Sequence, residues 1–244
     1  MDAIILAAGY ATRLYPLTDN TPKSLLDVAG KPIIEHIVRK LEQIDAIIKI
    51  YIVTNDKFEQ HFKKWLSNFE SSKPIEIIND RTKSNEDRLG ALGDIHFVIN
   101  QKNIDDEIMV VAGDNLFELS LTDVANFFKK KKSNVIVLYD VKDFELAKQY
   151  GIVEVENQLV VNFVEKPISP KSTLASTVIY FLPKKTITLI GKYIAQGNNT
   201  DKIGSFIEWL HKRDKVFAYI TDKKWYDIGS IEQLKKADKY YKEK

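Results

Sequence analysis

Short apolar runs that alternate with stretches of helical periodicity constrain this chain more than any other feature of its sequence. Runs with the length of buried strands lie at residues 3–8, 48–54, 75–78 and 108–112. Between them, apolar residues recur every three or four positions at 33–41, 57–69 and 90–99. Strands that alternate with helices in this way are typical of a parallel sheet covered by crossover helices. The first half of the chain is therefore predicted to be α/β.

The alternation loosens after residue 140. A helix over 124–128 and a strand over 135–139 complete the first pattern, and strands then dominate between Gly151 and Phe181. These strands are predicted at 152–155, 160–164 and 178–181. Turn-rich pieces such as 167–172 separate them, which favours antiparallel additions to the sheet. The remainder is predicted as helices at 187–194, 206–210 and 231–241 and a strand at 216–220. We therefore expect an α/β fold with a Rossmann-like, mixed but mostly parallel central sheet flanked by helices.

Composition excludes several classes of protein. The 244 residues suffice for one sizeable core, and 36 Lys plus Arg against 34 Asp plus Glu give a net charge of +2. No global field would hold nucleic acid or a membrane, and Lys129–Lys132 is interpreted as a solvated helix end. The chain has no Cys, and its opening apolar run is too short for a signal peptide. We expect a cytoplasmic protein that binds neither nucleic acid nor membrane.

A loop after the first predicted strand carries two spaced basic residues. It runs from Ala7 to Leu14 and includes Arg13, and Lys23 follows ten residues later. Small residues let backbone N–H groups approach a phosphate closely. Arg13 offers a planar fork of donors and Lys23 a compact charge, which together suit a polyphosphate. The spacing matches neither a Walker A loop nor a Rossmann fingerprint, and a plain turn with solvated basic residues is the alternative.

The same segment resembles the signature of the sugar-1-phosphate nucleotidyltransferases. That signature, L-A-A-G-x-G-T-R-L-x-P-L-T…P-K, is matched from Leu6 through Lys23. The resemblance implies a nucleotide-diphospho-sugar transferase architecture and places Lys23 near the reacting phosphorus. It also implies a nucleotide-binding loop made by Ala8, Gly9, Tyr10, Ala11, Thr12 and Arg13. Ala11 stands where the family has a second Gly, so a left-handed backbone there would cost about 1 kcal/mol.

A second segment resembles the part of the family that contacts the nucleobase. Leu89–Asp94 is similar to the family's L-G-T-A-G-A, which implies that the base lies against the backbone of Gly90. Asn85 stands where thymidylyl members carry a Gln that reads the base edge. An ordinary polar loop residue is an equal interpretation of Asn85, because loops favour Asn.

Two aspartates are candidates for a metal site. Asp114 ends a buried-type strand in Val110–Asn115, where ligands gather in open α/β sheets. A carboxylate there is a hard oxygen ligand suited to Mg²⁺ bound jointly with phosphates. Trp225–Gly229 resembles the family's W-x-D-x-G, which implies that Asp227 lies beside the same ion. Capping of a neighbouring turn or helix is the alternative for each aspartate.

The resemblance also implies a site for the sugar phosphate. Val164–Pro167 reproduces the family's E-K-P, in which Glu165 accepts hydrogen bonds from sugar hydroxyls and Lys166 neutralises the phosphate. Tyr150–Glu154 resembles Y-G-V-V-E, so the sugar is expected to lie on the bare backbone of Gly151. Ala175–Val178 follows A-V-T-G, with Val178 in place of Gly, which would narrow the pocket. The residues expected to contact the sugar phosphate are Asn115, Gly151, Glu165, Lys166 and Thr177.

Together these segments imply an enzyme that joins a nucleoside triphosphate, dTTP or UTP, to a sugar 1-phosphate with Mg²⁺. The residues expected to carry the chemistry are Arg13, Lys23, Asp114, Lys166 and Asp227. We expect one domain over 1–244, with a nucleotide-binding part at about 1–140, a sugar-binding part at about 141–230 and a closing helix at 231–244. The alternatives are a cytidylyltransferase acting on a polyol phosphate, a noncatalytic regulatory homologue and a glycosyltransferase that uses sugar nucleotides. A homo-oligomer remains open.

Overall fold

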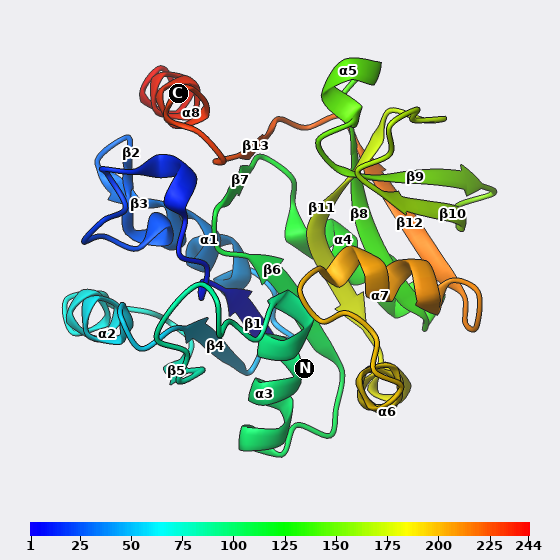
Figure 1. The fold of residues 1–244 in the computed structure, drawn as a ribbon, viewed down its shortest axis with the longest axis horizontal. Coiled ribbons are helices and arrows are strands. Elements are labelled where there is room, and N and C mark those ends of the chain that lie inside the picture. Colours follow the sequence, from blue (N-terminus) through cyan, green and yellow to red (C-terminus); the bar gives the residue numbers. More distant parts are fainter.

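A mixed sheet of nine strands forms the centre of the computed structural model, which describes residues 1–244 (Figure 1). The strand order across the sheet is β5-β4-β1-β6-β11-β8-β12-β10-β9. Its strands are β1 (Asp2–Leu6), β4 (Lys49–Thr54), β5 (Ile75–Asn79), β6 (Ile108–Ala112), β8 (Asn134–Asp140), β9 (Gly151–Glu156), β10 (Leu159–Glu165), β11 (Leu174–Leu182) and β12 (Val216–Thr221). The predicted strands are therefore present, within a few residues of their expected bounds.

The expectation of a mostly parallel sheet holds only for its N-terminal part. Four neighbouring pairs are parallel, namely β5–β4, β4–β1, β1–β6 and β12–β8. The other pairs are antiparallel, because β11 enters between β6 and β8 against both, and because β9 and β10 form a hairpin. Sequence periodicity reports burial on each face but not strand direction, so this balance was not predictable from it.

Helices cover both faces of the sheet and form two separate cores (Figure 1). Successive residues of β1 point to opposite faces, so Ile5 joins one core and Ile4 the other. One core includes residues of four helices, α1 (Ile33–Glu42), α2 (Glu59–Leu66), α4 (Leu121–Lys131) and α8 (Ile231–Lys242). The other contains residues of α3 (Ala91–Lys102), α6 (Lys184–Ala195) and α7 (Ile203–Leu210). None of the helices has the length and apolarity needed to cross a bilayer.

A second, two-stranded sheet brings the end of the chain back to its middle. In it β7 (Asn115–Phe117) pairs antiparallel with β13 (Trp225–Asp227), and Asp227 lies opposite Asn115. The two strands are only three residues long each, too short to leave a periodic signal. The elements β2 (Asp27–Val28), β3 (Lys31–Pro32) and α5 (Phe144–Ala147) are also too short to be predicted from periodicity. This small sheet places β13 directly beyond the end of β6.

Candidate active site

A cavity of about 560 Å³ opens beyond the carboxyl ends of β1 and β6, where ligands bind in open α/β sheets. It is lined by residues from both halves of the chain. Nearly all of the residues singled out by sequence lie on its wall. These are Ala8, Gly9, Tyr10, Ala11, Thr12, Arg13, Lys23, Asn85, Gly90, Asp114, Asn115, Gly151, Glu165, Lys166 and Asp227.

The loop after β1 is held so that its backbone N–H groups stay free. Asn55, which is fully buried, donates from Nδ2 to the carbonyl of Ala8 at 2.8 Å. The hydroxyl of Thr18 donates to the carbonyl of Ala11 at 2.8 Å. The N–H groups of residues 9–11 donate to no protein acceptor. Because the carbonyls are engaged and these N–H groups are not, the loop is shaped to receive an anion.

Ala11, which stands where the family signature has a Gly, adopts a left-handed backbone conformation with φ 50° and ψ 39°. Ala11→Gly is expected to raise the free energy of unfolding by up to about 1 kcal/mol, because relief of strain outweighs the added flexibility of Gly. Urea unfolding measures this change. Ala8→Gly is the matched control, since Ala8 has no positive φ, and it is expected to destabilise the protein. An equal fall in the free energy of unfolding of both variants would show that the backbone of Ala11 is not strained.

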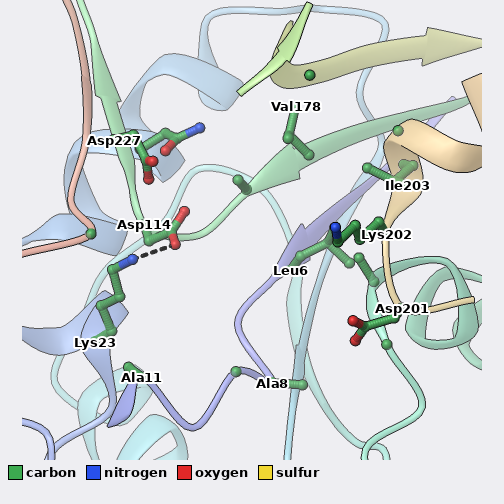
Figure 2. Close-up of a pocket in the computed structure, with 18 of the residues that line it drawn as sticks. Leu6, Ala8, Ala11, Lys23, Asp114, Val178, Asp201, Lys202, Ile203 and Asp227 are labelled. Atoms are coloured by element: carbon green, nitrogen blue, oxygen red, sulfur yellow. Dashed lines mark hydrogen bonds and ion pairs between the residues drawn. The ribbon is translucent and has the colours of Figure 1, made fainter. Parts of the chain in front are cut away.

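Asp114 and Asp227 meet at the junction of the two sheets (Figure 2). The backbone N–H of Ile228 donates to the Asp114 carbonyl at 3.1 Å, which ties the two segments together. Lys23 Nζ donates to Asp114 Oδ2 at 2.6 Å. Two carboxylates that are 113 positions apart in the sequence thus lie side by side, next to one lysine from the opening loop.

The pKa of Asp227 is shifted by burial and by the charged side chains around it. Burial raises the pKa of Asp227 to about 6, and the neighbouring Asp114 carboxylate adds to this rise. The cations Lys23, Lys166 and Arg13 oppose it. Asp114, Lys23, Lys166 and Arg13 therefore all act on Asp227, and all five side chains line one cavity. Burial, the larger cause, and repulsion from Asp114 together outweigh the effect of the three cations on this pKa.

The carboxylate pair has the donor chemistry that a divalent cation requires. Asp114 and Asp227 offer hard oxygen ligands from two separate segments at the end of a strand. A divalent cation between the two carboxylates would relieve the repulsion that Asp114 exerts on Asp227. The residues present therefore fit a Mg²⁺ ion bound together with phosphates.

The sugar half of the cavity is built around Glu165. A Cβ on Gly151 would lie 2.6 Å from Phe163 Cζ and 3.0 Å from Glu165 Oε2, and a Cβ on Gly204 would overlap the same carboxylate. Both glycines therefore make room for Phe163 and Glu165, and Gly151 also lines the cavity. Lys202 Nζ lies 3.8 Å from Glu165 Oε1. Sequence reasoning missed Gly204 and Lys202, because neither belongs to a motif.

Thr177 does not reach the cavity. It is 1% exposed, its hydroxyl donates to the Val137 carbonyl at 3.0 Å, and its own carbonyl accepts from Asn115 Nδ2 at 2.8 Å. Its neighbours Ser176 and Val178 line the wall instead. Val178 has φ 54°, a conformation that a β-branched residue rarely adopts.

Gly90 and Asn85 lie at the rim contributed by the segment before α3. Gly90 has φ 80°, and a Cβ there would collide with the backbone of Asp201. Arg88 forms an ion pair with Asp201 at 2.8 Å and donates to the Asn85 carbonyl at 2.7 Å. Gly90 is therefore needed for packing between residues 85–92 and 198–204, and the exposed Asn85 lies at the mouth of the cavity.

Asp80 and Asp94 also line the cavity, and sequence reasoning did not single them out. They are 4% and 6% exposed, and each has one enclosed carboxylate oxygen without a hydrogen-bond partner. One signal was visible in the sequence. Asp94 occupies the last position of the segment that resembles L-G-T-A-G-A, where the family pattern has an apolar Ala.

Comparison with known proteins gives consistent matches along the whole chain. The pattern of the nucleotidyl transferase family matches residues 2–244. The chain is 32% identical over 246 residues to the bifunctional protein GlmU of Methanocaldococcus jannaschii, which covers 100% of this chain and 55% of that protein. It thus spans about half the length of that relative. It is 28% identical over 249 residues to UTP–glucose-1-phosphate uridylyltransferase AglF of Haloferax volcanii, which covers 100% of this chain and 97% of that protein.

Solved structures share the same fold. A Bacillus anthracis structure described as a glucose-1-phosphate thymidylyltransferase with sucrose superimposes with a TM-score of 0.82 at 26% identity, covering 100% of this chain and 96% of that chain. A UDP-glucose pyrophosphorylase complexed with UDP-glucose gives a TM-score of 0.83 at 22% identity, covering 100% of this chain and 99% of that chain. The mixed α/β architecture is therefore that of solved nucleotidyltransferases.

Proposed function

Since this chain belongs to the nucleotidyl transferase family, we propose that it joins a nucleoside triphosphate to a sugar 1-phosphate and releases pyrophosphate. One observation carries the proposal. The carboxylates of Asp114 and Asp227 and the cations of Arg13, Lys23 and Lys166 interact within one cavity. A single domain serves both substrates, with the nucleotide held mainly by residues 1–140 and the sugar phosphate mainly by 141–230.

The nucleotide is proposed to be UTP or dTTP. Relatives described as uridylyl- and thymidylyltransferases support this choice. The triphosphate would lie on the free N–H groups of residues 9–11, with Arg13 on its outer phosphates. Lys23 would lie near the α-phosphate, where the bond changes occur.

The sugar phosphate would enter from the side of Glu165 and Lys166. Its oxygen attacks the α-phosphorus in line, and pyrophosphate leaves from the opposite side, so atoms and charge balance without a covalent enzyme intermediate. The attacking phosphate is already ionised at neutral pH, so positioning and charge stabilisation suffice. Lys23, Lys166 and Arg13 reduce the repulsion between the two polyanions. Mg²⁺, which Asp114 and Asp227 would hold, supplies further neutralisation of phosphate charge.

The two cations of the opening loop weigh against a glycosyltransferase. Such an enzyme binds a diphosphate that is already made, which gives no reason for Arg13 and Lys23 together beside Asp114. The gathering of five charged side chains on one cavity wall weighs equally against a homologue that binds no substrate.

A pyrophosphate-release assay tests the proposal. The protein is incubated with Mg²⁺ and each nucleoside triphosphate against a panel of sugar and polyol phosphates. We expect release with UTP or dTTP and a hexose 1-phosphate. Release only with CTP and a polyol phosphate would support the cytidylyl alternative, and no release with any pair would refute the transferase function.

Val178 is expected to restrict which sugar phosphate enters. Val178→Gly should raise kcat/KM at least about tenfold for sugar phosphates with bulky substituents, since a methylene-sized change in a pocket is worth 10-fold or more. Val178→Ala is the matched control, because it removes the two methyl groups but keeps a side chain at φ 54°. Competition assays across the panel measure the change. An unaltered substrate range in both variants would show that Val178 does not bound the sugar site.

A further inference from the structure

Two buried carboxyl groups lie on the cavity wall away from Asp114 and Asp227. Asp80 directly follows β5, and Asp94 lies in the first turn of α3. Asp80 Oδ1 accepts from the N–H and the hydroxyl of Thr82, at 2.7 and 2.8 Å. Asp80 Oδ2 and Asp94 Oδ1 are enclosed and have no partner. Asp94 accepts no hydrogen bond from any protein donor, although it is only 6% exposed.

A structural role does not account for this pair. An acidic residue in the first turn of a helix often caps backbone N–H groups, but the first turn of α3 has no side-chain cap. The guanidinium of Arg88, in the same loop, is engaged by Asp201. Buried carboxyl groups without partners are costly, and when they line a cavity they mark a place where a ligand supplies the missing hydrogen bonds.

The pair carries one proton at neutral pH. Burial and the neighbouring Asp80 carboxyl group raise the pKa of Asp94 to about 8. Burial also raises the pKa of Asp80, and Asp87 of the following loop adds to that rise. Burial raises the pKa of the Tyr10 phenol in the opening loop, and the carboxylates of Asp80, Asp87 and Asp56 add to that rise. The pair is therefore a hydrogen-bond acceptor with a single negative charge.

The position of the pair matches the base rather than the phosphates. The phenol oxygen of Tyr10 lies 3.4 Å from the Thr82 hydroxyl, so the opening loop packs against this wall. Ala8, Gly90 and Ala91 line the cavity next to it. In Figure 2, Asp201, whose partner Arg88 belongs to the same wall, lies across the cavity from Lys23 and Asp227. A nucleotide with its α-phosphate near Lys23 would direct its base toward this wall.

We propose that Asp94, positioned by Asp80, accepts a hydrogen bond from N3–H of a uracil or thymine base and thereby selects the nucleotide. This rests on the proposed function, which supplies UTP or dTTP as substrate. N3–H is the sole N–H donor of these two bases, so a site that recognises it needs a buried acceptor. The proton on the pair limits the negative charge beside the two base carbonyls that flank N3–H.

The first test compares the preferred nucleotide, UTP or dTTP, with its N3-methyl analogue, which lacks the donor. For the wild type we expect kcat/KM to fall about 100-fold or more on methylation, because a site built for a hydrogen bond rejects an analogue without it. In Asp94→Ala the same ratio should fall below about tenfold, through a higher KM for the unmethylated nucleotide. Glu86→Gln, an exposed acid of the same loop outside the cavity, is the control.

The second test uses pH. The wild-type KM for the nucleotide is expected to rise as pH increases through about 8, where Asp94 loses its proton and two charges face the base carbonyls. The side chain of Asp94→Asn cannot ionise, so the KM of this variant should rise less over the same pH range. Both proteins are assayed with the same nucleotide, so any ionisation of its base affects both KM values equally. A smaller rise in this variant supports the proposal.

Two results would overturn the inference while leaving the transferase function intact. One is equal use of the N3-methyl analogue by the wild type with normal pyrophosphate release. The other is a wild-type preference for CTP, GTP or ATP over both UTP and dTTP. Absence of release with every nucleotide would instead refute the function on which the inference rests, so the two failures are distinguishable.

Discussion

Asp227→Asn is expected to lower kcat by about 10³-fold, because the amide would remove one of the two carboxylates that we propose hold Mg²⁺ beside the reacting phosphates. The variant keeps the shape of the side chain and the pairing of β13 with β7. Asp114 and its partner Lys23 remain in place. Pyrophosphate release at saturating substrates, measured over a range of Mg²⁺ concentrations, reports the loss. Partial recovery at high Mg²⁺ is expected if a single carboxylate still holds the ion weakly.

The stability of the same variant should move in the opposite direction. The pKa of Asp227 is raised in the folded protein to about 6, so its ionisation opposes folding at pH 7. The stability associated with the neutral form is fully present below the ordinary carboxyl range and is lost as pH rises through about 6. Asp227→Asn stays neutral, so at pH 7 its Tm is expected to equal or exceed that of the wild type.

Asp105→Asn is the control for Asp227→Asn, since Asp105 pairs with Lys184 on the surface and lies outside the cavity. It should retain wild-type turnover. Wild-type activity in Asp227→Asn would remove this carboxylate from the chemistry. A large fall in Tm would mean that its role is structural.

Lys23→Met is expected to lower kcat by about 10²- to 10³-fold, because the variant would lose the positive charge that we propose lies beside the reacting phosphorus. Methionine retains most of the apolar length of the side chain, which is only 15% exposed. The loss also leaves Asp114 without its 2.6 Å partner. Lys23 lowers the pKa of Asp227, so its removal should raise that pKa. The pH below which activity falls is therefore expected to be higher in the variant than in the wild type. Turnover measured between pH 5 and 8 tests both effects.

Lys49→Met is a matched control, because Lys49 makes an ion pair of the same 2.6 Å length with Glu76 but does not line the cavity. Its turnover should stay within about twofold of wild type, since exposed pairs contribute little. If both lysine variants lost activity to the same extent, general destabilisation would explain the result. If neither did, Lys23 would not act on the phosphates.

The local pattern of apolar and charged residues in the sequence predicted much of the fold and part of the site. Alternating apolar runs predicted β1, β4, β5 and β6 with the helices between them, because a parallel sheet buried on both faces requires nearly continuous apolar strands. The position of Asp114 after β6 followed from the same pattern. Small residues in the opening loop, with Arg13 and Lys23 spaced beyond it, indicated phosphate binding, because that chemistry depends on nearby groups in the sequence.

Only the tertiary structure decided what distant residues do to one another. The short pairing of β7 with β13 joins Asp114 to Asp227, and three-residue strands have no periodicity to detect. Gly151 makes room for Phe163 and Glu165, and the side chain of Thr177 points inward toward Val137. The acid pair of Asp80 and Asp94 emerged only when β5 and α3 were brought together, since burial and repulsion are properties of the folded surroundings.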